Sequence, residues 1–165
     1  MHRYLLALGL AALPATAHAQ DAKAVFIDAN GQEAGTAVLT PTPSGVLIQI
    51  EATGLPQNQW VAFHIHETGS CDHNTGHESA GGHFNPSDAP HGILSDGGPH
   101  AGDMPNVWAD AEGTARAQVF NPLVTLAEGT NAIKGRALMI HAGPDDYSTQ
   151  PTGGAGDRLA CAVIE

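Results

Sequence analysis

Apolar and polar residues alternate in two separate parts of the chain, with turn residues between the alternating runs. Before residue 68, the runs predict four short strands, within 23–32, 33–45, 46–59 and 60–67. After residue 105 they predict four more, within 106–113, 114–120, 136–142 and 158–165. Helical periodicity is almost missing from both parts. We therefore expect an all-β fold, an eight-stranded antiparallel Greek-key β-sandwich or barrel with long loops.

The stretch between the two sets of runs, residues 68–105, loses the alternation and is rich in glycine, proline, aspartate and histidine. A loop of this length is unusual inside a compact domain unless it is functional and is held by something other than packing. We expect bound metal and a disulfide to supply the restraint, which makes this a metal-binding loop.

The first nineteen residues have the three parts of a secretory signal peptide. They are basic His2-Arg3, an apolar run over 4–13, and the small-residue pattern Ala17-His18-Ala19. We expect residues 1–19 to be removed and residues 20–165 to form a single exported domain. No later stretch of the sequence is long and apolar enough to span a bilayer, so we expect no membrane partner.

The chain is acidic, with a formal net charge of −11 that becomes −12 when Arg3 is lost with the signal peptide. Polyanionic surfaces repel such a protein, so we expect neither nucleic acid nor an anionic membrane as a partner.

Two cysteines, Cys71 and Cys161, remain in the exported part of the chain. A pair of cysteines in an oxidising compartment is most simply interpreted as one disulfide, which here would join the middle of the chain to its C-terminus. Metal-binding thiolates are the alternative, but neither cysteine has a second one nearby.

Histidines supply the candidate chemistry. If residues 60–67 form a strand, His64 and His66 point to the same side, while Phe63 and Ile65 face the core. Taken alone, the pair is explained equally well as two solvated histidines on an exposed strand face. His141, at the end of another predicted strand, is a third candidate ligand.

The loop carries a second set of donors, namely His83, His91, His100 and Asp103. Three imidazoles and one carboxylate suit tetrahedral zinc, and four protein ligands leave no open position, so such an ion would be structural. The alternative is a disordered polar loop. The first set remains one ligand short unless one histidine is shared between the two.

Six separate motifs occur along the chain in the same order as in a known family. They are "FHIHE", "GSC", "GGHFNP", "HAGDMPN", "MIHAGPDD" and "GGAGDRLACAVIE". Together they resemble the copper/zinc superoxide dismutases, particularly the exported bacterial branch, and the resemblance covers nearly all of residues 24–165. It implies one copper and one zinc ion per subunit, with the imidazole of His83 shared. By resemblance, copper is held by His64, His66, His83 and His141, and zinc by His83, His91, His100 and Asp103.

The resemblance also implies the activity, which is dismutation of superoxide to molecular oxygen and hydrogen peroxide as an antioxidant defence in the periplasm. Copper would change oxidation state while His83 picks up a proton. Arg158 matches the arginine beside the copper that attracts the superoxide anion. Asp145 matches the aspartate that hydrogen-bonds one copper ligand and one zinc ligand, here expected to be His64 and His91.

One departure concerns how the substrate is attracted. Exported bacterial relatives often carry a lysine around the first cysteine, and this chain has none there. His73 and His77 lie in that segment and could act as pH-dependent steering charges. Solvated loop histidines or a weak extra metal site are the alternatives.

Two other functions compete with the enzyme, a copper or zinc carrier and a disulfide-tied binding module. A carrier needs no arginine beside the metal, and a binding module leaves the metal donors unexplained. The sequence leaves a monomer and a homodimer both open, and we expect Trp60 and Trp108 to be packing residues.

Overall fold

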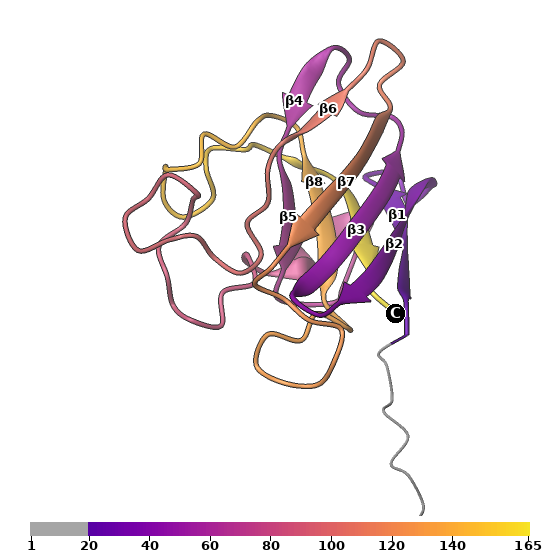
Figure 1. Ribbon diagram of the computed structural model, residues 1–165. Helices are drawn as coiled ribbons and strands as arrows, with labels where there is room; N and C mark the ends of the chain where they lie inside the picture. Colours follow the sequence, from indigo (N-terminus) through magenta and orange to yellow (C-terminus); the bar gives the residue numbers. More distant parts are fainter. Residues whose placement is uncertain (1–19) are drawn as a thin grey trace, which may run out of the picture.

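The computed structural model describes residues 20–165, so the predicted signal peptide, residues 1–19, lies outside the described part. The described chain is an all-β barrel with two short 3-10 turns (Figure 1). Its elements in chain order are β1 (Ala22–Asp28), β2 (Glu33–Thr42), β3 (Gly45–Ala52), β4 (Gln59–Val61), β5 (Phe63–His66), η1 (His73–Thr75), η2 (Glu78–Ala80), β6 (Val107–Ala109), β7 (Ala115–Asn121), β8 (Ala137–His141) and β9 (Arg158–Val163).

All strand pairings are antiparallel, and the strands follow the order β4-β6-β7-β3-β2-β1-β9-β8-β5. The pairings of β3 with β7 and of β1 with β9 join strands far apart in the sequence, as a Greek key requires. The predicted all-β, antiparallel Greek-key fold is therefore confirmed.

The strand count differs from the prediction because one predicted strand is divided. Residues 60–67 were expected to form a single strand, but the run breaks at Ala62 into β4 and β5, which lie at opposite ends of the strand order. The Ala62 amide donates to the Gly143 carbonyl (2.8 Å), and the His141 amide donates to the Ala62 carbonyl (3.0 Å). One segment thus supplies both end strands, which leaves the sheet nearly closed into a barrel.

The core lies inside the barrel and contains the inward-facing apolar residues of most strands. Phe63 and Ile65 are fully buried there, as the alternation predicts. His64 and His66, on the other side of β5, are also buried, but beneath the loops rather than in the apolar core. The alternative of two solvated histidines is therefore wrong.

The long loop between β5 and β6 contains η1, η2 and isolated bridges, but no strand. It lies on the same side of the barrel as residues 142–157 (Figure 1). Two backbone bridges fix it against β5, His64 with Asp103 and His66 with His83. Within residues 20–165, no helix is long and apolar enough to cross a membrane.

The predicted disulfide between Cys71 and Cys161 is present, with Cα atoms 5.5 Å apart. Cys161 lies in β9 and is fully buried, whereas Cys71 begins the segment that carries η1 and η2. The bond therefore ties the long loop to the barrel wall.

The two tryptophans pack against each other on the barrel surface. Trp60 and Trp108 face each other across β4 and β6 with ring centroids 5.4 Å apart, but they are 53% and 45% exposed. Their indole rings pack edge-to-face on the outer surface of the barrel and not in its core.

We expect the Cys71→Ser/Cys161→Ser variant to lose about 4 kcal/mol of unfolding free energy, because the disulfide closes a loop of 90 residues in the unfolded chain. Urea denaturation of the metal-free protein measures this loss. Adding a thiol reductant to the unaltered protein should reproduce it, and should leave the variant unchanged. Equal urea midpoints for the oxidised protein and the variant would contradict the expectation.

Candidate metal centre

Two groups of buried donors meet beneath the loops, and one histidine belongs to both. In each group, four potential ligand atoms lie within 4.8 Å of one another. The first group is His64, His66, His83 and His141, and the second is His83, His91, His100 and Asp103. None of these residues exposes more than 7% of its surface. The structure thus brings together every candidate metal ligand that the sequence pointed to.

Secondary structure fixes the first group. β5 pairs with β8, so that His64 and His66 lie on a strand beside the one that ends at His141. A shift of register between Ile140 and His141 sets the direction of the His141 ring, as bulges near functional sites often do. The Nε2 atoms of His66 and His141 are 3.4 Å apart.

Hydrogen bonds determine which nitrogen of each ring is available to a metal. His66 Nδ1 donates to the Gly81 carbonyl (2.9 Å), and His141 Nδ1 to the Gly156 carbonyl (3.3 Å), which leaves Nε2 of both rings as an acceptor. Within the two groups, four other buried nitrogens have no hydrogen-bond partner: His64 Nδ1, His83 Nε2, His91 Nδ1 and His100 Nδ1. Unpaired buried nitrogens are costly unless an ion binds them, so the residues fit two metal ions.

The second group is organised around the carboxylate of Asp103. His83 Nδ1 lies 2.9 Å from Oδ1, and the amides of Gly92 (2.8 Å) and His100 (3.0 Å) donate to Oδ2. Burial raises the pKa of Asp103, but these hydrogen bonds outweigh burial and hold the pKa well below its usual range. The carboxylate is therefore ionised at neutral pH and can bind a cation.

Burial keeps the rings of the first group neutral. It lowers the pKa of His64 to about 4, that of His66 to about 2 and that of His141 to about 3. A neutral imidazole has a free lone pair, so these rings can bind a metal at pH 7 without first losing a proton.

Asp145 connects the two groups. Its Oδ2 lies 2.8 Å from His64 Nε2, and its Oδ1 lies 3.1 Å from His91 Nε2. Each ring must donate to the carboxylate through Nε2, which leaves Nδ1 for a metal. The structure thus places Asp145 between His64 and His91, the two residues named from the sequence.

Three residues that support this arrangement were not identified from the sequence. Asn106 exchanges two hydrogen bonds with the backbone of Asp145 (2.9 Å each), and Gln150 does the same with the backbone of His91 (2.8 Å each). Tyr147 accepts from the Asn106 amide through its hydroxyl (2.8 Å). Their partners lie 39 to 59 residues away in the chain, so no local motif marks them.

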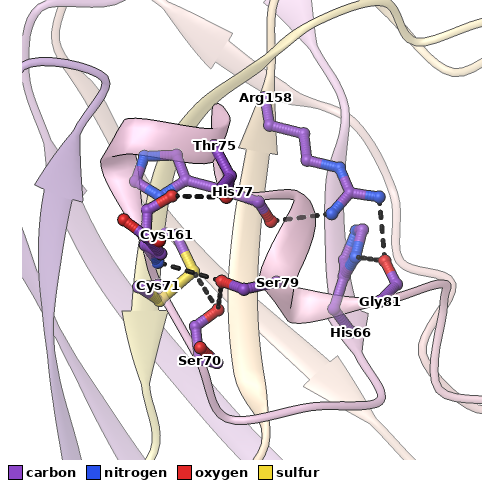
Figure 2. Close-up of a disulfide and its surroundings, with 10 residues drawn as sticks. His66, Ser70, Cys71, Thr75, His77, Ser79, Gly81, Arg158 and Cys161 are labelled. Atoms are coloured by element: carbon purple, nitrogen blue, oxygen red, sulfur yellow. Dashed lines mark hydrogen bonds between the residues drawn. A yellow bond between two sulfur atoms is a disulfide. The ribbon is translucent and has the colours of Figure 1, made fainter.

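Arg158 lies beside the first group because of strand register. It is the first residue of β9 and pairs with His141 of β8. Its guanidinium donates from Nη1 to the His77 carbonyl and from Nη2 to the Gly81 carbonyl, both at 2.8 Å (Figure 2). Gly81 also accepts from His66, so that one carbonyl orients both the arginine and a donor of the first group.

A family model described as copper/zinc superoxide dismutase matches residues 33–164 of this chain. The protein belongs to the copper/zinc superoxide dismutase family. A protein named "Superoxide dismutase [Cu-Zn] 2" from Aquifex aeolicus is 52% identical over 147 residues, which cover 87% of this chain and 85% of that protein.

Solved structures agree with this family. The Cu/Zn superoxide dismutase from Brucella abortus superposes with a TM-score of 0.73 at 32% identity, and the match covers 88% of this chain and 100% of that one. A superoxide-dismutase-like protein from Bacillus subtilis gives a TM-score of 0.81 at 34% identity, covering 85% and 95%. The family uses copper and zinc, and the two donor groups described above fit both ions.

The predicted steering role is wrong for His77, and so is the alternative of a solvated ring there. His77 is fully buried, so its ring presents no charge to an approaching anion, and burial also lowers its pKa. His73 is half-buried and packs against Gly31. In the described part of the chain, neither residue joins a group of three or more metal donors.

Replacing Asp145 with asparagine should weaken binding of both metals by about 10- to 100-fold, because one amide cannot accept from both His64 and His91. Competition with a chromophoric chelator measures each affinity. Asp146→Asn is the matched control, since the Asp146 carboxylate bonds only within its own turn, to Ser148 and Thr149. Equal losses in the two variants would show that charge, and not the link between the rings, matters.

Two adjacent glycines test how closely the loop packs on Asp145. Both have positive φ, +68° at Gly153 and +65° at Gly154, but a methyl group at Gly153 would lie 1.8 Å from Asp145 Oδ1, whereas one at Gly154 meets nothing. Gly154→Ala should lower the free energy of unfolding by about 1–2 kcal/mol, from backbone strain alone. Gly153→Ala should cost about 1–3 kcal/mol more through overpacking, and should weaken metal binding. Denaturation and chelator competition check both values, and identical behaviour would contradict the packing argument.

Proposed function

We propose that this protein dismutates superoxide, converting two superoxide anions and two protons into molecular oxygen and hydrogen peroxide. The observation that carries the proposal is the shared His83, which joins two complete sets of four donors, with Arg158 paired across the sheet from His141. In this proposal, His64, His66, His83 and His141 hold copper, and His83, His91, His100 and Asp103 hold zinc.

Copper bound in the first group would supply a one-electron redox couple, which zinc in the second group cannot do. The protein itself supplies rigidity and proton handling. His83 presents Nε2 to the first group while Nδ1 lies against Asp103, so Nε2 is the atom at which we place the proton that leaves with the peroxide. Asp145 keeps His64 and His91 in the tautomers that face the metals.

Arg158 would attract and orient the anion. The two neighbouring carbonyls fix its guanidinium, and its start position in β9 places it next to the first group. The other two arginines of the described chain are engaged elsewhere. Arg116 pairs with Glu51 on the surface, and Arg136 stacks 3.8 Å from the Phe84 ring centroid. In an acidic protein, one positioned cation beside the site therefore has a large share of the attraction.

The Cys71–Cys161 disulfide and the bacterial relatives indicate an exported protein. We further propose that residues 20–165 act as a single domain in the periplasm after residues 1–19 are removed, and that the enzyme removes superoxide there. A metal carrier is the competing function, because it could use the same donors. A shared histidine and a fixed arginine would serve no purpose in a protein that must release its ions.

The test is dismutation by the chain starting at Gln20, oxidised and loaded with copper and zinc. We expect rapid dismutation with one ion of each metal per chain, and its loss in His141→Ala, which removes a copper donor. Arg158→Ala should keep both metals but lower the second-order rate constant about tenfold or more. Arg116→Ala removes the same charge far from the first group and should change the rate little.

Bound metals without dismutation would contradict the proposal and favour the carrier. Equal rates for Arg158→Ala and Arg116→Ala would leave the enzyme in place but remove the role of Arg158.

A further inference from the structure

His77 links the surroundings of Arg158 to the outer side of the barrel. It lies between η1 and η2, and its carbonyl is one of the two acceptors that orient the guanidinium. Figure 2 shows this carbonyl directed at Arg158 while the imidazole ring is turned to the opposite side. One residue thus contacts the arginine through its backbone and another part of the protein through its side chain.

The two acceptors of Arg158 are held in different ways. Gly81 is next to Gly82, whose amide donates to the Glu67 side chain (3.0 Å) and whose carbonyl accepts from the Glu67 amide (2.9 Å). A methyl group at Gly81 would lie 2.6 Å from Glu67 Oε1, so this end of the segment packs tightly on the residue that follows β5. The Gly81 carbonyl is therefore fixed to the barrel.

The His77 carbonyl has no such support from the barrel through its backbone. Its backbone partners are Asp72, which accepts from the His77 amide (3.0 Å), and Ala80, whose amide donates to the His77 carbonyl (3.1 Å). Both belong to the same loop segment. The nearest covalent restraint is the disulfide at Cys71, six positions earlier in the sequence.

The ring of His77 supplies the missing support. Of residues 71–79, His77 is the one that is fully buried. Burial lowers the pKa of His77, and the neighbouring Asp28 backbone carbonyl raises it, so the buried ring lies near the turn after β1. Neither ring nitrogen meets a hydrogen-bond partner of good geometry, so the ring acts mainly by filling space.

The backbone conformation of His77 lets its carbonyl and its ring point in different directions. Its φ is +61°, in the left-handed region that few residues other than glycine adopt, although histidine tolerates it better than most. Gly76 before it is also left-handed, with φ +62°. This conformation directs the carbonyl toward Arg158 and the ring into the protein.

We propose that His77 is a positioning residue for Arg158, whose buried ring anchors the segment that holds one side of the guanidinium. This inference rests on the proposed role of Arg158 in attracting the anion. The positioning is a property of the chain itself, so it can be measured in protein without copper as well as in the loaded enzyme.

The test uses His77→Gly, which keeps the left-handed backbone and the carbonyl but removes the ring. Thr75→Gly is the control, because it adds backbone freedom at an exposed position of the same segment and removes one hydrogen bond there, from the Thr75 hydroxyl to the Asp72 carbonyl (2.9 Å), but leaves the His77 ring in place. The first measurement is the affinity of azide for the copper- and zinc-loaded protein, followed by visible absorption. We expect His77→Gly to weaken azide binding about fivefold, and Thr75→Gly to change it less than about twofold.

The same change is then made in an Arg158→Ala background. This comparison separates an effect on the position of Arg158 from an unrelated distortion of the copper site. If His77 acts through Arg158, His77→Gly should change azide affinity less than about twofold there. An equal loss in both backgrounds would overturn the proposal. Should His77→Gly fail to fold, His77→Asn tolerates the same φ, leaves part of the ring's space unfilled, and is expected to show the same pattern.

The second measurement is hydrogen exchange of the Arg158 side chain, by nuclear magnetic resonance on zinc-loaded, copper-free protein. Exchange should be faster in His77→Gly than in Thr75→Gly, because the guanidinium is less well held. Equal exchange would overturn the anchoring. If Arg158→Ala itself leaves azide affinity unchanged, the proposed attraction of anions fails, and the exchange rates alone then decide whether His77 positions the arginine.

Discussion

Burying a polar ring nitrogen without a partner costs free energy, and this protein does so at four histidine nitrogens of its metal centre. In five of the six rings of the two groups, those of His64, His66, His83, His91 and His141, the other nitrogen bonds to a carboxylate or a carbonyl, which holds the free nitrogen facing the other donors. Much of the architecture around the centre depends on this arrangement. The long loop has few large apolar side chains, and besides the disulfide and the two backbone bridges, its attachment to the barrel relies on donors that two ions can satisfy.

The barrel strands hold some of the donor side chains in fixed positions, and irregular backbone at the strand ends and in the loops brings the remaining donors to them. β5 and β8 bring His64, His66 and His141 together through regular pairing, while the bulge before His141 and the bridge from β5 to Asp103 adapt the strands to the loop. Asp145 then connects the parts, because its two oxygens bond rings from the barrel wall and from the loop. A disturbance in either loop therefore reaches both metal positions through this single carboxylate.

The sequence predicted the strands, the disulfide and the candidate metal donors because each leaves a local or compositional signal, whereas the sharing of His83 came from the resemblance to the family. Alternation marked the strands, and paired cysteines in an exported chain marked the bond. The division at Ala62 could not be predicted, since an alanine within an alternating run looks like continued strand, and the bonds that break it involve Gly143 and His141. The paired hydrogen bonds of Asn106 with Asp145 and of Gln150 with His91 were not predicted either, because they also join residues far apart in the sequence. The burial of His77 depends on a positive φ between two turns, which nothing in its neighbours indicates.

The break at Ala62 has one more consequence. An open sheet presents unpaired amides and carbonyls along its outermost strands, and these can recruit strands from other molecules. Here the outermost strands, Gln59–Val61 and Phe63–His66, are short and are consecutive parts of one segment. The second of them is buried along its whole length. Little backbone is left on which a foreign chain could add, so the fold itself protects the protein against intermolecular strand pairing and the fibrous aggregation that follows from it.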